Sequence, residues 1–274
     1  MDGEVARAQR RAGVECAREL SFRAVSHLPH IEPGDDLASL LARALELSEL
    51  RPQLHDVLVI TSKVVAKAEN RYVDLRQVTP SQRALELGAQ TGKDPRVMEV
   101  ILWDTEAVSR STRDALIVRH HGGFVSANAG LDQSNAQPRH AAPDSGPWVL
   151  RLPADADASA AALRAALERH FGVQLGVIVS DSFGRPFRLG TVGTAIGLAG
   201  LPALDDHRGR RDLDGRTLEH TITATADQVC AAADLVCGQA DEARAAVLVR
   251  GLCFEPAAAS ARDLCRKPEG DLYV

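Results

Sequence analysis

The chain has 274 residues, of which 45% are hydrophobic and 25% are charged, a composition typical of a globular protein with a substantial core. Its formal net charge of -5 gives no basis for a surface that binds nucleic acid or an anionic membrane, and aromatic residues, at 4%, are too few for base-stacking platforms. No apolar run reaches the roughly 18 residues of a membrane span, so we expect none.

The cysteines and the N-terminal residues indicate the compartment. The five cysteines are odd in number and include no Cys-x-x-Cys pair. This favours free thiols in a reducing, cytoplasmic compartment over disulfides or structural zinc. Residues 1–20 are rich in Arg, Glu and Ala without an apolar centre, so we expect an N-terminal extension there and no signal peptide.

The first half of the chain predicts three helices and three strands. In chain order we expect a loop at 28–34, a helix at 35–45, a strand at 57–60, a helix from 79 to Gly92, a helix from Asp94, a strand at 115–118 and a strand from Phe124. Asp35 or Asp36 is suited to cap the first helix. The segment 79–82 has the form of a capping box, with Pro80 at the first helical position.

The second half continues the mixture of helices and strands. We expect a loop at 137–147, a helix from Asp157 to about Gly172, a strand at 176–179, a polar loop or hairpin at 205–216, a helix at 225–236 and a strand at 245–249. Glycines between 190 and 200 indicate a chain that bends or that another backbone approaches closely. Because the elements do not alternate strictly, the pattern predicts an α/β or mixed α+β fold that is not a Rossmann fold.

Several well-known site motifs are missing from the sequence. It contains no Gly-x-x-x-x-Gly-Lys-Ser/Thr, no Gly-x-Gly-x-x-Gly, no Gly-x-Ser-x-Gly and no His-Glu-x-x-His. This argues against a P-loop protein, a dinucleotide-binding fold, an esterase and a zinc peptidase.

Two acidic turns, around Asp132 and Asp181, each follow a predicted strand and have hydroxyl or amide neighbours. Carboxylates from two strands can hold Mg²⁺ or Mn²⁺, which then bridge phosphate oxygens during phosphoryl transfer. Lys63 and Lys67 follow another strand and are suited to bind further phosphate oxygens. The alternative is that the aspartates cap turns and the lysines face water. The metal and phosphate interpretation requires these segments to converge in space.

Other polar groups allow two interpretations each. His120 and His121 precede two glycines and form either a catalytic or metal-binding pair or an exposed turn. A nucleophilic Ser180 or Ser182 would need a histidine base and an orienting acid, and the sequence has no signature for that arrangement.

The arginines of the second half also allow two interpretations each. Arg185 and Arg188 can meet phosphate or carboxylate oxygens, or belong to an ordinary solvated turn. The charged segment 206–216 either contacts an anionic substrate or forms a surface with internal ion pairs.

Several segments, taken in order, resemble the coenzyme F-420 gamma-glutamyl ligases, which attach L-glutamate to the deazaflavin coenzyme precursor. The segments are Ile-Thr-Ser-Lys-Val-Val-Ala-Lys-Ala-Glu at 60–69, Ala-Asn-Ala-Gly-Leu-Asp-Gln-Ser-Asn at 127–135, Leu-Pro-Ala-Asp-Ala-Asp-Ala-Ser at 152–159, Ile-Val-Ser-Asp-Ser-Phe-Gly-Arg-Pro-Phe-Arg at 178–188, Ala-Ile-Gly-Leu-Ala-Gly at 195–200, Arg-Gly-Arg-Arg-Asp-Leu-Asp-Gly-Arg at 208–216 and Val-Leu-Val-Arg-Gly at 247–251. The resemblance covers roughly residues 28 to 251.

The resemblance implies a ligase that uses GTP with two Mg²⁺ or Mn²⁺ ions. By this likeness Asp132 and Asp181 bind one metal ion and act in catalysis, and Ser182 and Gln239 hold a second. Ser182 stands where many relatives carry threonine, and its hydroxyl can still ligate. The residues implied for the nucleotide site are Leu28, Pro29, His30, Ile31, Ser62, Lys63, Lys67, Asn135 and Gln239, with the loop at 237–244.

The resemblance also implies a two-lobed α/β fold of its own type, with neither a Rossmann nor a P-loop arrangement, that forms a homodimer. We expect an extension at 1–20, a two-lobed ligase unit at 21–254, a tail at 255–274 and no C-terminal flavin reductase-like domain. The substrates would be the deazaflavin precursor, L-glutamate and GTP, joined through an acyl phosphate. Two alternatives remain: a metal-dependent phosphatase or phosphotransferase, and a non-catalytic protein that binds a nucleotide or deazaflavin.

Overall fold

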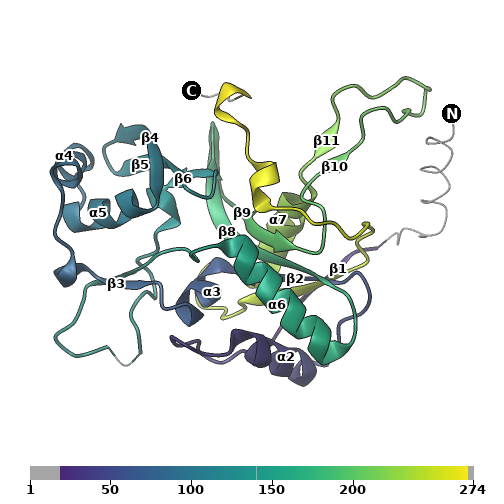
Figure 1. Cartoon of the computed structure of the whole chain (residues 1–274), viewed down its shortest axis with the longest axis horizontal. Coiled ribbons are helices and arrows are strands. Elements are labelled where there is room, and N and C mark those ends of the chain that lie inside the picture. The colour runs from purple at the N-terminus through teal and green to yellow at the C-terminus, as the bar shows by residue number, and fades with distance from the viewer. Residues whose placement is uncertain (1–18, 140, 271–274) are drawn as a thin grey trace.

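A five-stranded sheet forms the centre of the computed structural model, which describes residues 19–139 and 141–270 (Figure 1). The strands lie in the order β1 (Ser21–Ala24), β12 (Ala246–Arg250), β2 (Val57–Thr61), β8 (Gly176–Arg185) and β9 (Arg188–Ala199). Strands β2 and β8 are parallel, and the other neighbours are antiparallel. The parallel pair brings two strand ends to the same edge of the sheet.

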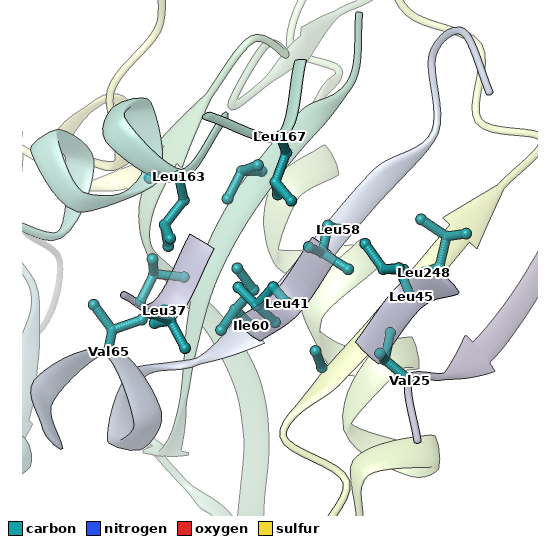
Figure 2. Packing of buried hydrophobic residues seen from close by; sticks show 14 of the residues in the cluster. Val25, Leu37, Leu41, Leu45, Leu58, Ile60, Val65, Leu163, Leu167 and Leu248 are labelled. Carbon is teal, nitrogen blue, oxygen red and sulfur yellow. The ribbon is translucent and has the colours of Figure 1, made fainter. Parts of the chain in front are cut away.

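Helices cover both faces of this sheet because its strands are apolar on both sides. Helices α2 (Leu37–Leu47) and α6 (Ala156–Phe171) pack on one face, where their leucines meet Leu58 and Ile60 of β2, as Figure 2 shows. Val57 and Val59 point the opposite way and pack with α7 (Thr225–Cys237). Successive strand residues alternate between faces, so the unbroken apolar run of β2 fits a strand that is buried on both sides.

A smaller body of structure, at the left of Figure 1, has a hydrophobic cluster of its own. Its sheet has the order β4 (Thr105–Thr112), β5 (Ala115–His120) and β6 (Val125–Ala127), with α4 (Gln82–Thr91) and α5 (Pro95–Trp103) packed beside it. Ser81 and Asp94 cap the two helices through their side chains, and Gly92 ends α4 in the left-handed conformation.

The remaining elements are short. Their bounds are α3 (Ser62–Ala68), the β3–β7 ribbon (Tyr72–Asp74 with Trp148–Leu150), the β10–β11 pair (Asp205–Asp206 with Ile222–Thr223) and the 3-10 helices Leu75–Gln77, Asn128–Gly130, Ala261–Leu264 and Pro268–Gly270. Helix α3 follows β2 directly, so the polar residues after that strand are held on a helix. No helix in the described ranges is long and apolar enough to cross a membrane.

The mixed α/β class, without a Rossmann or P-loop arrangement, is confirmed, but the expected end of the strand at 176–179 is wrong. Strand β8 continues to Arg185, because β9 pairs with it along its whole length and Asp181 lies opposite Thr194. The polar residues at its centre therefore belong to a strand and not to a turn. The pairing with β9 fixes the backbone that carries their carboxylate and hydroxyl groups.

Smaller predictions also need correction. Ser81 is the N-cap of α4, so Pro80 precedes the cap, and α6 begins at Ala156 with Asp155 as its cap. Strands β1 and β4 were not expected, since both are rich in polar or exposed residues. Residues 1–18 of the expected extension lie outside the described residues. The four cysteines in the described part of the chain, Cys230, Cys237, Cys253 and Cys265, are free thiols.

Candidate functional site

A cavity of about 740 Å³ lies where the parallel strands β2 and β8 end. Every residue predicted for the site lines it: Leu28, Pro29, His30, Ile31, Ser62, Lys63, Lys67, Asp132, Asn135, Asp181, Ser182 and Gln239. These residues come from the loop before α2, the start of α3, the loop after β6, the middle of β8 and the segment after α7. The structure thus brings together segments that are distant in sequence.

The register of the sheet explains how two of these segments meet. Thr61 of β2 lies opposite Ser180 of β8, so Ser62 and Asp181 follow side by side. The Ser62 hydroxyl donates a hydrogen bond to Asp181. Because β2 and β8 are parallel, both chains deliver polar residues to one end of the sheet.

Asp132 enters the cavity from the loop after β6. Its backbone forms two hydrogen bonds with Leu150 of β7, of 2.9 and 2.8 Å, which fix the loop against the β3–β7 ribbon. The Asp132 carboxylate accepts bonds of 2.8 Å from both the backbone N–H and the hydroxyl of Ser134. Its other oxygen lies 2.6 Å from Lys63 Nζ.

The Asp181 carboxylate is enclosed at the cavity wall. Burial, together with the negative charge of Asp132, raises its pKa to about 6, although hydrogen bonds from the Ser182 N–H and Ser62 and the charge of Lys63 act in the opposite direction. Gly130 has a φ of +69°, and a Cβ atom there would lie 3.2 Å from Asp181 Oδ2. The enclosed charge costs free energy unless a cation lies beside it.

A second group of oxygen atoms lies on the α7 side of the cavity. The Ser182 hydroxyl is 3.3 Å from Asp234 Oδ1, and the Gln239 side-chain amide donates to both, over 3.1 and 2.6 Å. Burial raises the pKa of Asp234. Sequence reasoning missed Asp234; its signal was an acidic residue in the last turn of an alanine-rich helix, close to Gln239.

Lys67 is nearly buried, with 7% of its surface exposed. Burial and the neighbouring charge of Lys63 lower its pKa, while the carboxylates of Glu32 and Asp132 raise it. A buried ammonium with few direct partners is suited to meet an anionic ligand, because that ligand would replace the lost hydration.

The donor set fits a hard divalent cation. Carboxylates from Asp132, Asp181 and Asp234, the Ser182 hydroxyl and the Gln239 amide offer only oxygen ligands, which Mg²⁺ and Mn²⁺ prefer. The described residues contain no compact group of three or more His, Cys, Asp or Glu side chains of the kind that holds a metal by itself. The remaining ligands of such an ion would therefore be phosphate oxygens or water, as is usual for Mg²⁺.

The other candidates lie away from this cavity or are held in structural roles. Arg208 pairs with Asp206 on the β10–β11 arm, so this part of segment 206–216 carries surface ion pairs. Arg188 begins the second strand of the exposed β8–β9 hairpin. Ser180 is buried beside Cys230 and donates no proton to a histidine in the described structure. His120 and His121 line a separate cavity.

The fold and cavity define a class of α/β protein with carboxylates and lysines gathered at the end of a parallel strand pair. The profile of the F420-0:Gamma-glutamyl ligase family matches residues 26–251, and the chain belongs to this family. Similar proteins named coenzyme F420:L-glutamate ligase occur in Methanopyrus kandleri (47% identical, covering 89% of this chain and 93% of the relative), Methanothermobacter thermautotrophicus (42%; 85% and 89%) and Haloarcula marismortui (40%; 91% and 93%).

Proposed function

We propose that this protein is a ligase that adds L-glutamate to the deazaflavin coenzyme F-420 precursor, with GTP as the phosphoryl donor and Mg²⁺ or Mn²⁺ as cofactor. Family membership and the names of the relatives support the substrates. The observation that carries the proposal is the convergence of Asp132, Asp181, Lys63 and Lys67 on one cavity. Carboxylates for a cation and ammonium groups for phosphate are what a triphosphate-dependent ligase needs.

Under this proposal the reaction proceeds in two steps, phosphoryl transfer and amide formation. The precursor carboxylate attacks the γ-phosphorus of GTP, a new C–O–P linkage forms, the bond to the β-phosphate oxygen breaks, and GDP leaves. The α-amine of glutamate then attacks the acyl carbon; the C–N bond forms, the C–O bond to phosphate breaks, and inorganic phosphate and a proton are released. Activation is needed because a free carboxylate has no good leaving group.

The chain's own residues bind and position the anions. Lys67, enclosed and short of partners, is placed to hold a phosphate oxygen. Lys63 is on the same helix, and its ion pair with Asp132 would open as phosphate enters, leaving that carboxylate for a cation. Asp132 and Asp181 would hold one ion, and Ser182 and Gln239, joined by Asp234, a second. Such ions neutralise phosphate charge and let the two anionic substrates approach.

We also propose that the protein acts as a cytoplasmic homodimer. The family resemblance supports the dimer, and the free thiols of the described cysteines are consistent with a reducing compartment.

The test is an incubation of the protein with the deazaflavin precursor, L-glutamate, GTP and Mn²⁺, with product mass, GDP and phosphate measured together. We expect a product heavier by one or more glutamyl residues and an amount of GDP that matches the amide bonds formed. Release of phosphate from GTP at the same rate without glutamate would identify a phosphatase instead. Nucleotide binding without any turnover would identify a binding protein.

A further inference from the structure

A second cavity, of about 490 Å³, adjoins the first and shares Arg151 and Leu152 with it as lining residues. It lies between the smaller body and the start of α6. The additional lining includes Arg71, Asp104, His120, His121, Asp155 and Arg262. The Leu152 side chain lies beside Gly130, which itself adjoins Asp181. The second cavity therefore opens next to the carboxylates of the first.

Three guanidinium groups line this cavity, and one carboxylate serves two of them. Arg151 makes a bidentate contact with Asp104, with bonds of 2.8 and 2.5 Å. Arg71 Nη2 is 3.9 Å from the same carboxylate, and its Nε donates to the Leu152 carbonyl oxygen over 2.8 Å. Burial and the charge of Arg151 lower the pKa of Arg71, while the carboxylates of Asp104 and Glu69 raise it.

The third guanidinium, that of Arg262, has no carboxylate partner among the described residues; its Nη2 donates to the His121 carbonyl oxygen over 2.7 Å. Arg71 and Arg262 thus keep N–H donors for another anion. Guanidinium groups bind carboxylates in a fixed, often bidentate geometry.

His120 adds an uncharged donor. Its Nδ1 accepts a 2.8 Å hydrogen bond from the Gly122 N–H, and its ring stacks on Phe124 with centroids 4.6 Å apart. Burial lowers its pKa to about 4, so the ring is neutral near pH 7 and the proton resides on Nε2. No acceptor for that proton lies within the described parts of the chain, which leaves Nε2–H for a ligand oxygen.

The two aspartates at the start of α6 differ in how many of their carboxylate oxygens accept hydrogen bonds. Both carboxylate oxygens of Asp157 accept hydrogen bonds: Oδ1 from the Leu198 and Ala261 N–H groups, and Oδ2 from the Ser260 hydroxyl. Asp155 caps α6 through Oδ1 alone, and within the described residues Oδ2 accepts no hydrogen bond. Asp155, an exposed residue in the lining of the cavity, therefore keeps one carboxylate oxygen without a hydrogen bond from the described part of the chain.

We propose that this second cavity binds the incoming L-glutamate, with its carboxylates at Arg71, Arg262 and His120 and its ammonium group near Asp155. This assignment rests on the function proposed above. An amino acid with two carboxylates and one ammonium matches three donors and one free acceptor. The shared wall at Leu152 places the bound amine beside the cavity in which the activated precursor would form. A carboxylate at the end of the precursor itself is the other source of the same chemistry.

The variants Asp155→Asn and Arg71→Lys test the assignment. Asparagine caps helices as well as aspartate does, so the first variant keeps the fold and removes only the charge facing the ammonium. We expect the KM for glutamate to rise roughly tenfold or more in each, with the Kd for GTP and the KM for the precursor unchanged. Arg208→Ala, on the surface arm, is the control and leaves all three constants unchanged.

The preference for L-glutamate over L-glutamine is a second measurement, which would not change if Arg71 only stabilised the fold. We expect the wild type to prefer glutamate strongly and Arg71→Lys to lose about tenfold of that preference. A normal KM for glutamate, or a rise confined to the KM for the precursor, overturns the assignment. Titration of L-glutamate into the wild type and Asp155→Asn by calorimetry tests the site without turnover, so a failed ligase reaction and a wrong glutamate site are distinguished.

Discussion

The ionised Asp181 carboxylate is expected to lower the free energy of unfolding of the metal-free protein, and replacing Asp181 by asparagine measures the size of this effect. Its pKa rises from 3.8 to about 6, so the shift is about two units, or roughly 3 kcal/mol at about 1.36 kcal/mol per unit. Since the folded state has the higher pKa, it binds more protons between about pH 4 and 6. The free energy of unfolding therefore falls as pH rises through that window.

The comparison is denaturant unfolding of the wild type and Asp181→Asn from pH 4 to 7.5 in EDTA. Asparagine cannot ionise, so we expect similar stability at pH 4 and a variant more stable by up to about 3 kcal/mol at pH 7. Added Mn²⁺ should stabilise the wild type at pH 7 and have little effect on the variant. Asp214→Asn, on the exposed arm, should behave as the wild type.

Two results would refute this reasoning. One is a difference between wild type and Asp181→Asn that does not change with pH. The other is a variant that is less stable than the wild type at pH 7 without metal. Either would show that Asp181 serves mainly as a hydrogen-bond acceptor for Ser62 and Ser182.

Three further outcomes are expected. Lys67→Ala should raise the Kd for GTP about tenfold in calorimetry and change the rate at saturating GTP less, and an unchanged Kd would contradict the phosphate role. Gly197→Ala should lower the free energy of unfolding by at least about 2 kcal/mol, because the added Cβ would overlap the backbone at the start of α6. Gly184→Ala is the control, since open space surrounds that position, and should lower it by less than about 1 kcal/mol. Equal losses in the two variants would rule out the close approach. Asp56→Asn should cost about 3 kcal/mol, since Asp56 is 1% exposed and paired with an arginine of β12; a loss below about 1 would show that the pair contributes little.

Local patterns predicted most elements but not how they assemble. The apolar run of β2 and the cap of α2 are signals contained in a few neighbouring residues, and the structure confirms them. The parallel pairing of β2 with β8 is a long-range fact. It decides whether Ser62 meets Asp181, and nothing in either segment specifies it.

The resemblance, not periodicity, supplied the full set of site positions that line the cavity. Single residues gave weaker signals: the polar centre of β8 looked like a turn because hydroxyl and carboxylate side chains are rare in buried strands. Asp234 escaped notice because an acidic residue on a helix is common at protein surfaces. Only its burial and its partners distinguish it.

The central claim is that Asp132 and Asp181 hold divalent cations against a triphosphate in one cavity. Anomalous scattering from crystals grown with Mn²⁺ and a non-hydrolysable GTP analogue tests it most directly. We predict a manganese peak within coordination distance of both carboxylates, with phosphate oxygens completing the shell. Nucleotide density in the cavity with manganese absent from both aspartates would contradict the claim.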